Sequence, residues 1–303
     1  MIDPVLEELA ARLDELGVRG KWRRRVLAEA RDHLEELDAE DEADAAGRFG
    51  DVGEVARLVA AGLATSRTRS AAFFVFGALA LTGLVYTASL ALVGPAGGWT
   101  DVTSGHAGAF GPLLAIALVV LPQVAFVSGC LALLRSVRIR RMPVAEAELS
   151  LVRRRCTVAL ASGAATLLAL GLMAANEAGA LAAWWVVGTI AACVLLVIPL
   201  AFASVGVVRA GAPAALPGGG EGDVFDDLAP VFSNATVRRL DLPAHPWRFA
   251  ALTAASVGLA GCAAGWYAEG DPGSGLVRGG FEAIALLACF ALFGRVLGLR
   301  RSE

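Results

Sequence analysis

The stretch that decides the fold covers residues 71–93, reads AAFFVFGALALTGLVYTASLALV and carries no charged residue. A helix of about 20 apolar residues crosses the hydrocarbon layer of a membrane, which is about 30 Å thick. This stretch is therefore long enough to span a bilayer. Because lipid offers backbone N–H and C=O groups no hydrogen-bond partner, we expect it to be helical throughout.

Five further apolar stretches follow along the chain. We place the six predicted spans at about 71–93, 110–134, 156–175, 182–208, 247–267 and 279–298. The composition agrees, since 56% of the residues are hydrophobic and 18% are charged, with a mean hydropathy of +0.63. A water-soluble domain of this size could not bury so much apolar surface. We therefore expect an all-α protein, in which residues 67–303 form a six-helix transmembrane bundle.

Lys and Arg are unevenly divided between the two sets of predicted connections. Arginines gather before the first span, after the second and fourth spans and in the tail, at Arg67, Arg69, Arg135, Arg138, Arg140, Arg141, Arg153, Arg154, Arg155, Arg209, Arg238, Arg239, Arg300 and Arg301. The opposite connections contain only Arg278. Short connections rich in Lys and Arg are retained on the cytoplasmic side. We expect no signal peptide, and we predict a protein of the cytoplasmic membrane with both termini in the cytoplasm.

The residues before the first span have a different character. Residues 1–70 carry 11 Lys and Arg against 16 Asp and Glu. Direct nucleic-acid binding is not expected of so acidic a segment, since such binding depends on clustered Lys and Arg. Apolar residues recur at helical spacing, at Leu6, Leu9, Leu13, Leu16, then Trp22, Val26, Ala30, Leu34, Leu37, then Val55, Leu58, Val59, Leu63. This spacing predicts amphipathic helices, and we expect residues 1–66 to form a small cytoplasmic helical domain.

Three motifs in this domain carry a resemblance to a known family. They are Leu6-Glu-Glu-Leu9, the helix containing Glu29 and His33, and Arg48-Phe-Gly-Asp51 followed by Glu54-Val-Ala56. Together they resemble the HAAS signalling domain, also called the permease prefix domain; Val52 stands where that family usually has proline. The membrane part is similar to actinobacterial multi-pass proteins that carry this prefix. The resemblance implies an association with PadR-like transcriptional regulators and a coupling between a membrane sensor or permease and cytoplasmic control.

A basic run interrupts the acidic domain at Arg19, Lys21, Arg23, Arg24 and Arg25. We interpret this run as a solvated helix face partnered by Asp14, Glu15 and Glu29, with a lipid or protein contact as the alternative. His33 is interpreted as a surface residue among carboxylates, because no nucleophile or metal-ligand partner is near it in the sequence. The candidate contacts for a cytoplasmic partner are Arg23, Arg24, His33 and Glu36.

Two further sets of residues are candidates for a site. In the connection between the second and third spans, basic residues are expected to dock against anionic lipid or against the acidic domain; they are Arg138, Arg140, Arg141, Arg153, Arg154 and Arg155. Inside the spans, Gln123 follows Pro122, and Arg278 precedes Glu282 by four residues. We favour a packed kink at Pro122 with a satisfied Gln123 amide, with a transport site as the alternative. For Arg278 and Glu282 we favour a structural ion pair, with a proton or substrate site as the alternative.

Catalytic motifs are missing from the sequence. It contains no HExxH, GxSxG or P-loop pattern, and its five cysteines show no C-x-x-C spacing. We expect no catalytic residue, no cofactor and no metal. The leading hypothesis is a non-enzymatic signalling or regulatory membrane protein. The alternative is a transporter or permease subunit with the prefix as an assembly module. Small residues four apart, such as Gly261 and Gly265, allow close packing within one chain or between two, so a homo-oligomer stays open.

Overall fold

The computed structural model describes residues 2–39, 48–93, 110–139, 144–210 and 246–293. Eight helices lie within these ranges: α1 (Ile2–Glu15), α2 (Lys21–Ala39), α4 (Val52–Ala91), α7 (Phe110–Arg138), α8 (Glu146–Asn176), α9 (Ala183–Arg209), α13 (Pro246–Glu269) and α14 (Pro272–Phe293). Within the described residues, six of them are long and apolar enough to cross a membrane. The prediction of an all-α protein with six spans is confirmed, and the chain is described below as a multi-pass membrane protein.

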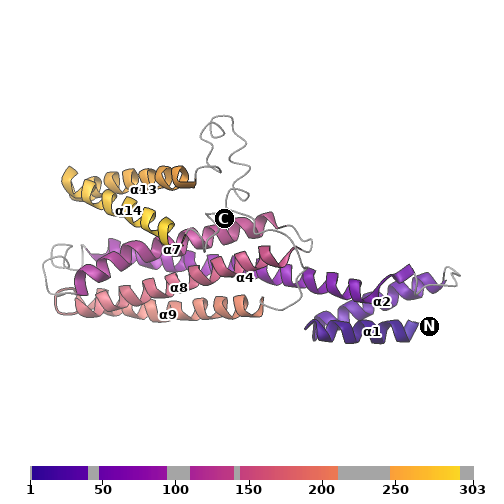
Figure 1. The fold of residues 1–303 in the computed structure, drawn as a ribbon. Helices are drawn as coiled ribbons and strands as arrows, with labels where there is room; N and C mark the ends of the chain where they lie inside the picture. Colours follow the sequence, from indigo (N-terminus) through magenta and orange to yellow (C-terminus); the bar gives the residue numbers. More distant parts are fainter. Residues whose placement is uncertain (1, 40–47, 94–109, 140–143, 211–245, 294–303) are drawn as a thin grey trace.

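The helices form three groups (Figure 1). The second half of α4 packs lengthwise with α7, α8 and α9, and these four helices are called the bundle. Helices α13 and α14 form a hairpin that touches the bundle through α14 and α7. Helices α1, α2 and the first half of α4 form the module, which lies beyond one end of the bundle. The end of the bundle next to the module is called the module end, and the opposite one the far end.

Small residues allow the bundle helices to approach each other closely. The side chain of Leu79 in α4 lies over Gly129 of α7 and Gly163 of α8, where a Cβ atom would stand only 2.8 and 2.6 Å from it. Val75, Leu79 and their neighbours share one continuous buried cluster with α7, α8 and α9. Since apolar contact with lipid does not drive spans together, this close backbone packing is what stabilises the bundle.

Helix α4 differs from the expectation of a short helix followed by a separate span. It runs without a break from Val52 to Ala91, about 60 Å at about 1.5 Å per residue. The polar residues 65–70 mark a boundary in the sequence, but Ser, Thr and Arg do not stop a helix, and no proline lies among them. Thr65 Oγ1 donates to Ala61 O at 2.8 Å, so its hydroxyl is satisfied within the helix. Module and bundle therefore share one helix.

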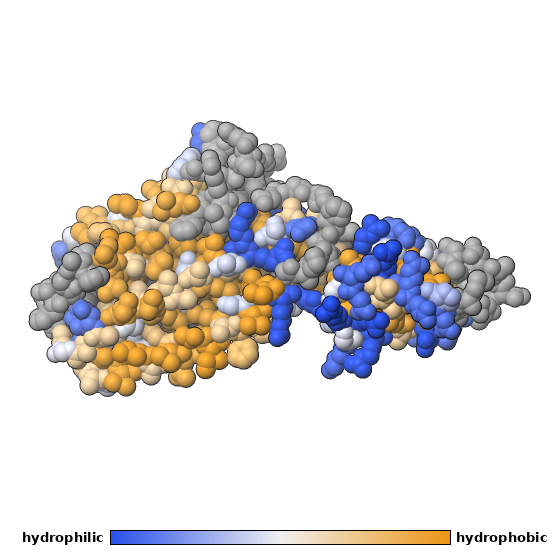
Figure 2. All heavy atoms as spheres, turned by 60° about the horizontal axis from the view of Figure 1, so that its bottom comes forward, coloured by the Kyte–Doolittle hydropathy of each residue, from blue (hydrophilic) through white to orange (hydrophobic). Residues whose placement is uncertain are grey.

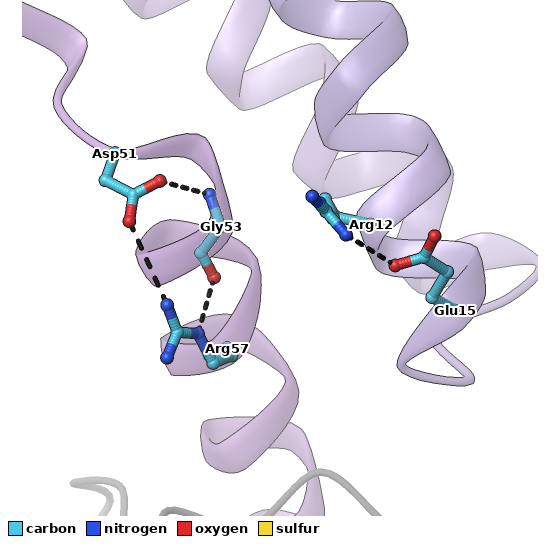
Figure 3. A network of polar contacts seen from close by, with 5 residues as sticks. All are labelled: Arg12, Glu15, Asp51, Gly53 and Arg57. Atoms are coloured by element: carbon cyan, nitrogen blue, oxygen red, sulfur yellow. Dashed lines mark hydrogen bonds and ion pairs between the residues drawn. The ribbon is translucent and has the colours of Figure 1, made fainter.

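The start of α4 is well defined (Figure 3). Gly50 has φ of +83°, a conformation that glycine adopts without steric cost. Asp51 caps the helix, because its Oδ1 accepts a hydrogen bond from Gly53 N at 2.9 Å. Arg57 adds a contact of 3.9 Å to Asp51 Oδ2 and donates from Nε to Gly53 O at 3.1 Å. Asp51 thus caps α4, with Val52 as the first residue of the helix.

The module has a small core of its own. Leu9, Leu13 and Val18 are buried in one cluster with Ala56, Ala60 and Leu63 of α4. Val26 and Ala30 of α2 pack against this cluster, as the helical spacing predicted. The expectation for Trp22 was wrong, because 48% of its surface is exposed. It lies in the first turn of α2, and Figure 1 shows the start of α2 at the end of the module that faces the bundle.

The other boundaries differ from the predicted ones in one important place. Helix α8 begins at Glu146, ten residues before the predicted third span. The arginines at 153–155 were assigned to a connection because of their charge, but they lie within this helix, and Arg is a good helix former. Helix α14, which contains the sixth span, begins at Pro272, before the predicted start at 279. The predicted end of this span at 294–298 lies outside the described residues.

The surface agrees with this division. Figure 2 shows apolar side chains over the visible face of the bundle and hydrophilic ones over much of the module. Large exposed hydrophobic residues such as Phe74, Leu195 and Phe202 lie on α4 and α9. An apolar surface of this extent is unusual on a soluble protein and is expected where side chains face lipid.

Candidate functional site

At the module end, three arginines donate hydrogen bonds to main-chain carbonyl oxygens. Arg69 Nε donates to Ser136 O at 3.0 Å, and Arg153 Nη1 to Ala210 O at 3.3 Å. Arg155 is fully buried, and its Nη1 donates to Leu131 O at 3.1 Å. Ser136 and Ala210 lie at the C-terminal ends of α7 and α9, where carbonyl groups lack intrahelical partners and the helix dipole is negative. These arginines therefore join the bundle helices to one another.

A buried ion pair lies beside them. Arg135 Nη2 of α7 contacts Glu148 Oε1 of α8 at 2.8 Å, and the Arg135 side chain is only 3% exposed. Sequence reasoning did not single out Glu148, because it was placed in a solvated connection. The pair holds the last turns of α7 against the first turn of α8.

The predicted docking set is divided by the structure. Arg153 and Arg155 are directed at carbonyl groups of the bundle, and burial of Arg155 removes it from any lipid or module surface. Arg138 is exposed and Arg154 partly exposed, and both already make contacts. Arg140 and Arg141 lie outside the described residues. Docking on anionic lipid or on the module stays a prediction for the other five arginines, which are Arg138, Arg140, Arg141, Arg153 and Arg154.

Inside the spans, Tyr86 compensates for Pro122. Proline has no N–H, so Pro122 leaves the carbonyl of Leu118, four residues earlier, without its helical hydrogen bond. Tyr86 Oη of α4 donates to that oxygen at 2.6 Å. A neighbouring helix therefore satisfies the carbonyl that Pro122 leaves without its helical hydrogen bond. This role of Tyr86 was not predicted, because the sequence of an apolar stretch does not show which main-chain carbonyl a tyrosine will bond.

We expect Tyr86→Phe to lower the thermal stability of the detergent-solubilised protein, by about 1–2 kcal/mol, since Leu118 O then has no donor in an apolar environment. In a Pro122→Ala background residue 122 supplies an N–H to that oxygen, so Tyr86→Phe should cost clearly less. Thermal unfolding of the two single variants and the double variant measures this difference. Tyr267→Phe, at an exposed tyrosine, is the control. Equal costs in both backgrounds would contradict the assignment.

The predicted polar residues inside the spans occupy two different settings. Arg278 Nε and Glu282 Oε1 are 3.4 Å apart on α14, which confirms the predicted ion pair. The Glu282 carboxylate packs directly over Gly261 of α13. Gln123 of α7 has a buried Oε1 without a hydrogen-bond partner in the described part of the chain, so the expectation of a satisfied amide was wrong for this oxygen.

Glu177 is a buried carboxyl group that the sequence analysis missed. It is the C-cap of α8 and is 2% exposed. Its Oε1 accepts a hydrogen bond from Asn176 Nδ2 at 3.1 Å, while its Oε2 has no partner among the described residues. A carboxylate here is opposed both by burial and by the negative end of the helix dipole.

Glu177→Gln is expected to raise the melting temperature at neutral pH. The amide keeps an oxygen for Asn176 and removes a poorly compensated charge, and we expect a gain of about 1 kcal/mol or more. Differential scanning fluorimetry in detergent measures it, with Glu146→Gln, at an exposed carboxylate of the same helix, as the control. A lower melting temperature for Glu177→Gln would show that the carboxylate is stabilised by a partner.

On the module, most of the candidate contact residues are accessible. Arg24, His33 and Glu36 are exposed on α2, and the rings of His33 and Phe49 have centroids 6.4 Å apart. Arg23 is ion-paired with Asp14 at 3.1 Å. Arg25 is ion-paired with Glu29 at 2.7 Å, as predicted, whereas Glu15 contacts Arg12 at 3.0 Å and not the basic run (Figure 3).

The described residues contain no group of three His, Cys, Asp or Glu side chains that could hold a metal ion. The five cysteines are free thiols. Comparisons with protein-family models, with curated proteins and with solved structures found no match. The observations that bear on function are therefore the six spans, the continuous helix α4 and the polar contacts described above.

Proposed function

We propose that this chain is a non-enzymatic signalling or regulatory membrane protein. In this proposal the bundle responds to the membrane or to a ligand, and the module presents its surface to a cytoplasmic protein. The resemblance of the module to the HAAS, or permease prefix, domain suggests a PadR-like transcriptional regulator as that partner. The observation that carries the proposal is the continuity of α4 between the two parts.

Helix α4 supports the proposal because it belongs to both cores. Ala56, Ala60 and Leu63 pack in the module, and Val75 and Leu79 pack in the bundle. A displacement of α4 within the bundle is then a displacement of the module, since packed helices move as rigid bodies. The exposed residues His33 and Glu36 are the surface offered to the partner.

The orientation belongs to the same proposal. The arginines at the module end favour placing the module, and both termini, in the cytoplasm of a cell whose cytoplasmic membrane holds the spans. A reporter fused near Thr103 should then be accessible from outside the membrane, and one fused at the N-terminus only from the cytosol. A Thr103 reporter accessible only from the cytosol would reverse the orientation and remove the signalling interpretation.

The signalling proposal is tested by partner capture and by deletion. Tagged protein purified in mild detergent should bring down a transcriptional regulator, and cross-linking should place that regulator on residues 20–50. Deletion of residues 1–66 should change transcription in the host cell. If no regulator is recovered and transcription is unchanged, the proposal fails.

Ser66→Pro is expected to abolish the transcriptional response while leaving the bundle assembled. Ser66 is exposed and lies between the two halves of α4, and proline in a helix interior removes a hydrogen bond and kinks or breaks the helix. Faster hydrogen exchange over residues 62–70 would verify the break, and Ser66→Ala is the control. A normal response in a variant with a verified break would show that continuity of α4 is not needed.

A transporter or permease subunit is the second candidate. Two observations favour it: the buried Gln123 Oε1 without a partner among the described residues, and the Arg278–Glu282 pair, whose carboxylate packs over Gly261 of α13. Polar groups inside spans are costly and are usually retained for a task. Flux of a substrate into proteoliposomes that is lost in Gln123→Leu and Glu282→Gln would support this candidate over the first.

A further inference from the structure

The turn between α1 and α2 lies at the end of the module that faces the membrane. Val18 in this turn is buried in the same cluster as Leu63 of α4, and α4 continues from Leu63 directly toward the bundle. Figure 1 shows the N-terminus at the opposite end of the module. The residues that follow Val18, from Arg19 to Arg25, therefore form the edge of the module nearest the bilayer, called here the basic edge.

The positive charge of the basic edge is only partly neutralised. Arg23 and Arg25 are ion-paired with Asp14 and Glu29. Arg19, Lys21 and Arg24 are exposed, and none of them contacts a carboxylate in the described part of the module. Three unpaired cations thus gather within six residues of a module whose net charge is otherwise acidic.

An aromatic ring accompanies these cations. Trp22 lies between Lys21 and Arg23 with 48% of its surface exposed. A tryptophan this exposed on a small soluble module loses apolar burial, whereas at the headgroup level of a membrane an indole ring is half buried and half wet. Exposed Trp together with Lys and Arg is the composition that favours an interfacial position.

The distance to the membrane is short enough for contact. Leu63 precedes Ala71, the start of the apolar stretch, by eight residues, which is about 12 Å along a helix. The headgroup layer occupies about 5–7 Å of that distance. The remaining gap is smaller than the Debye length of about 8 Å at physiological ionic strength. Lys21 and Arg24 are therefore within electrostatic range of lipid phosphates.

We propose that the basic edge docks on the anionic phospholipid headgroups of the bilayer that the bundle spans. Lys21 and Arg24 contact lipid phosphates, and Trp22 lies at the headgroup level. Docking fixes the module against the membrane surface and leaves His33 and Glu36, farther along α2, accessible. This proposal needs only the membrane spans and does not rest on a regulator.

Hydrogen exchange of the full-length protein in lipid nanodiscs tests the proposal. One set of nanodiscs contains phosphatidylcholine alone, and the other contains phosphatidylcholine with phosphatidylglycerol. Amides of residues 19–27 should exchange more slowly in the anionic nanodiscs, by about fivefold for each basic side chain engaged. High salt should remove the difference, because it screens the attraction.

Two double variants, each of which removes two positive charges, distinguish docking of the basic edge from a general effect of the module's charge. Lys21→Gln with Arg24→Gln should abolish the dependence on lipid charge. Arg31→Gln with Arg48→Gln removes the same charge from the part of the module farther from the bundle. This variant should keep the dependence of the exchange rates on lipid charge. Equal exchange rates of the unaltered chain in the two nanodiscs would overturn the proposal and point to an acidic protein as the occupant. Protection that persists in detergent would also overturn it, in favour of a contact within the chain.

Discussion

Gly279→Ala is expected to separate α14 from α13 and to destabilise the hairpin by about 3 kcal/mol. Gly279 packs against Gly258 O and Cys262 Sγ, and a Cβ at this position would also stand 2.8 Å from Cys262 N. Two of these atoms belong to the main chain of α13, so the clash cannot be relieved by a change of side-chain rotamer. The two helices must move apart, and they lose the close packing that joins them.

Thiol labelling provides a direct measurement of this separation. Cys262 is a free thiol covered by Gly279, so Gly279→Ala should increase its rate of modification by maleimide, resolved by mass spectrometry. Gly280→Ala is a matched control one residue away, because a Cβ there would meet nothing within 4 Å. Unchanged labelling of Cys262 in Gly279→Ala would show that the hairpin is packed differently.

Glu148→Ala should be the most damaging change at the module end. It leaves the buried guanidinium of Arg135 without its carboxylate, and loss of one partner of a buried ion pair costs about 3–5 kcal/mol. Since the Glu148 side chain is 30% exposed, we expect about 3 kcal/mol. Thermal unfolding in detergent, or the onset of aggregation on heating, measures this loss.

A second substitution should rescue the first. Arg135→Met removes the buried charge and keeps much of the side-chain volume, and well-packed apolar residues can replace a buried ion pair at little cost. The double variant Glu148→Ala with Arg135→Met should therefore be more stable than Glu148→Ala alone. Glu146→Ala, which removes an exposed carboxylate from the same turn, is the control. Additive effects in the double variant would contradict a direct interaction.

Hydropathy was sufficient to locate the spans. The stretch at 182–208 corresponds to α9, and that at 247–267 to α13, because burial in lipid depends on length and apolar content, which can be read locally. The prediction was wrong where polar and charged residues were taken as the end of a helix. The polar and charged residues at 65–70 and 153–155 were predicted to lie between helices. They lie within α4 and α8, because Ser, Thr and Arg are compatible with a helix.

The contacts between helices could not be predicted in the same way. The pair Arg278 and Glu282 was predicted because residues four apart share one helix face. The bond from Tyr86 to Leu118 O, the pair Arg135 and Glu148 and the burial of Glu177 join groups whose proximity depends on which helices are neighbours. Spacing along the chain carries no information on this choice when every span is apolar on all sides.

The continuous helix α4 also sets the direction in which the module faces. Each residue of an α-helix turns by about 100° and advances by about 1.5 Å, so adding one residue between Leu63 and Ala71 would rotate the module by more than a quarter turn about the axis of α4. A protein that binds one side of the module would then sense insertions with a period close to 3.6 residues. In this chain angular phase, as much as distance along the helix, determines the direction in which each side of the module faces around the axis of α4.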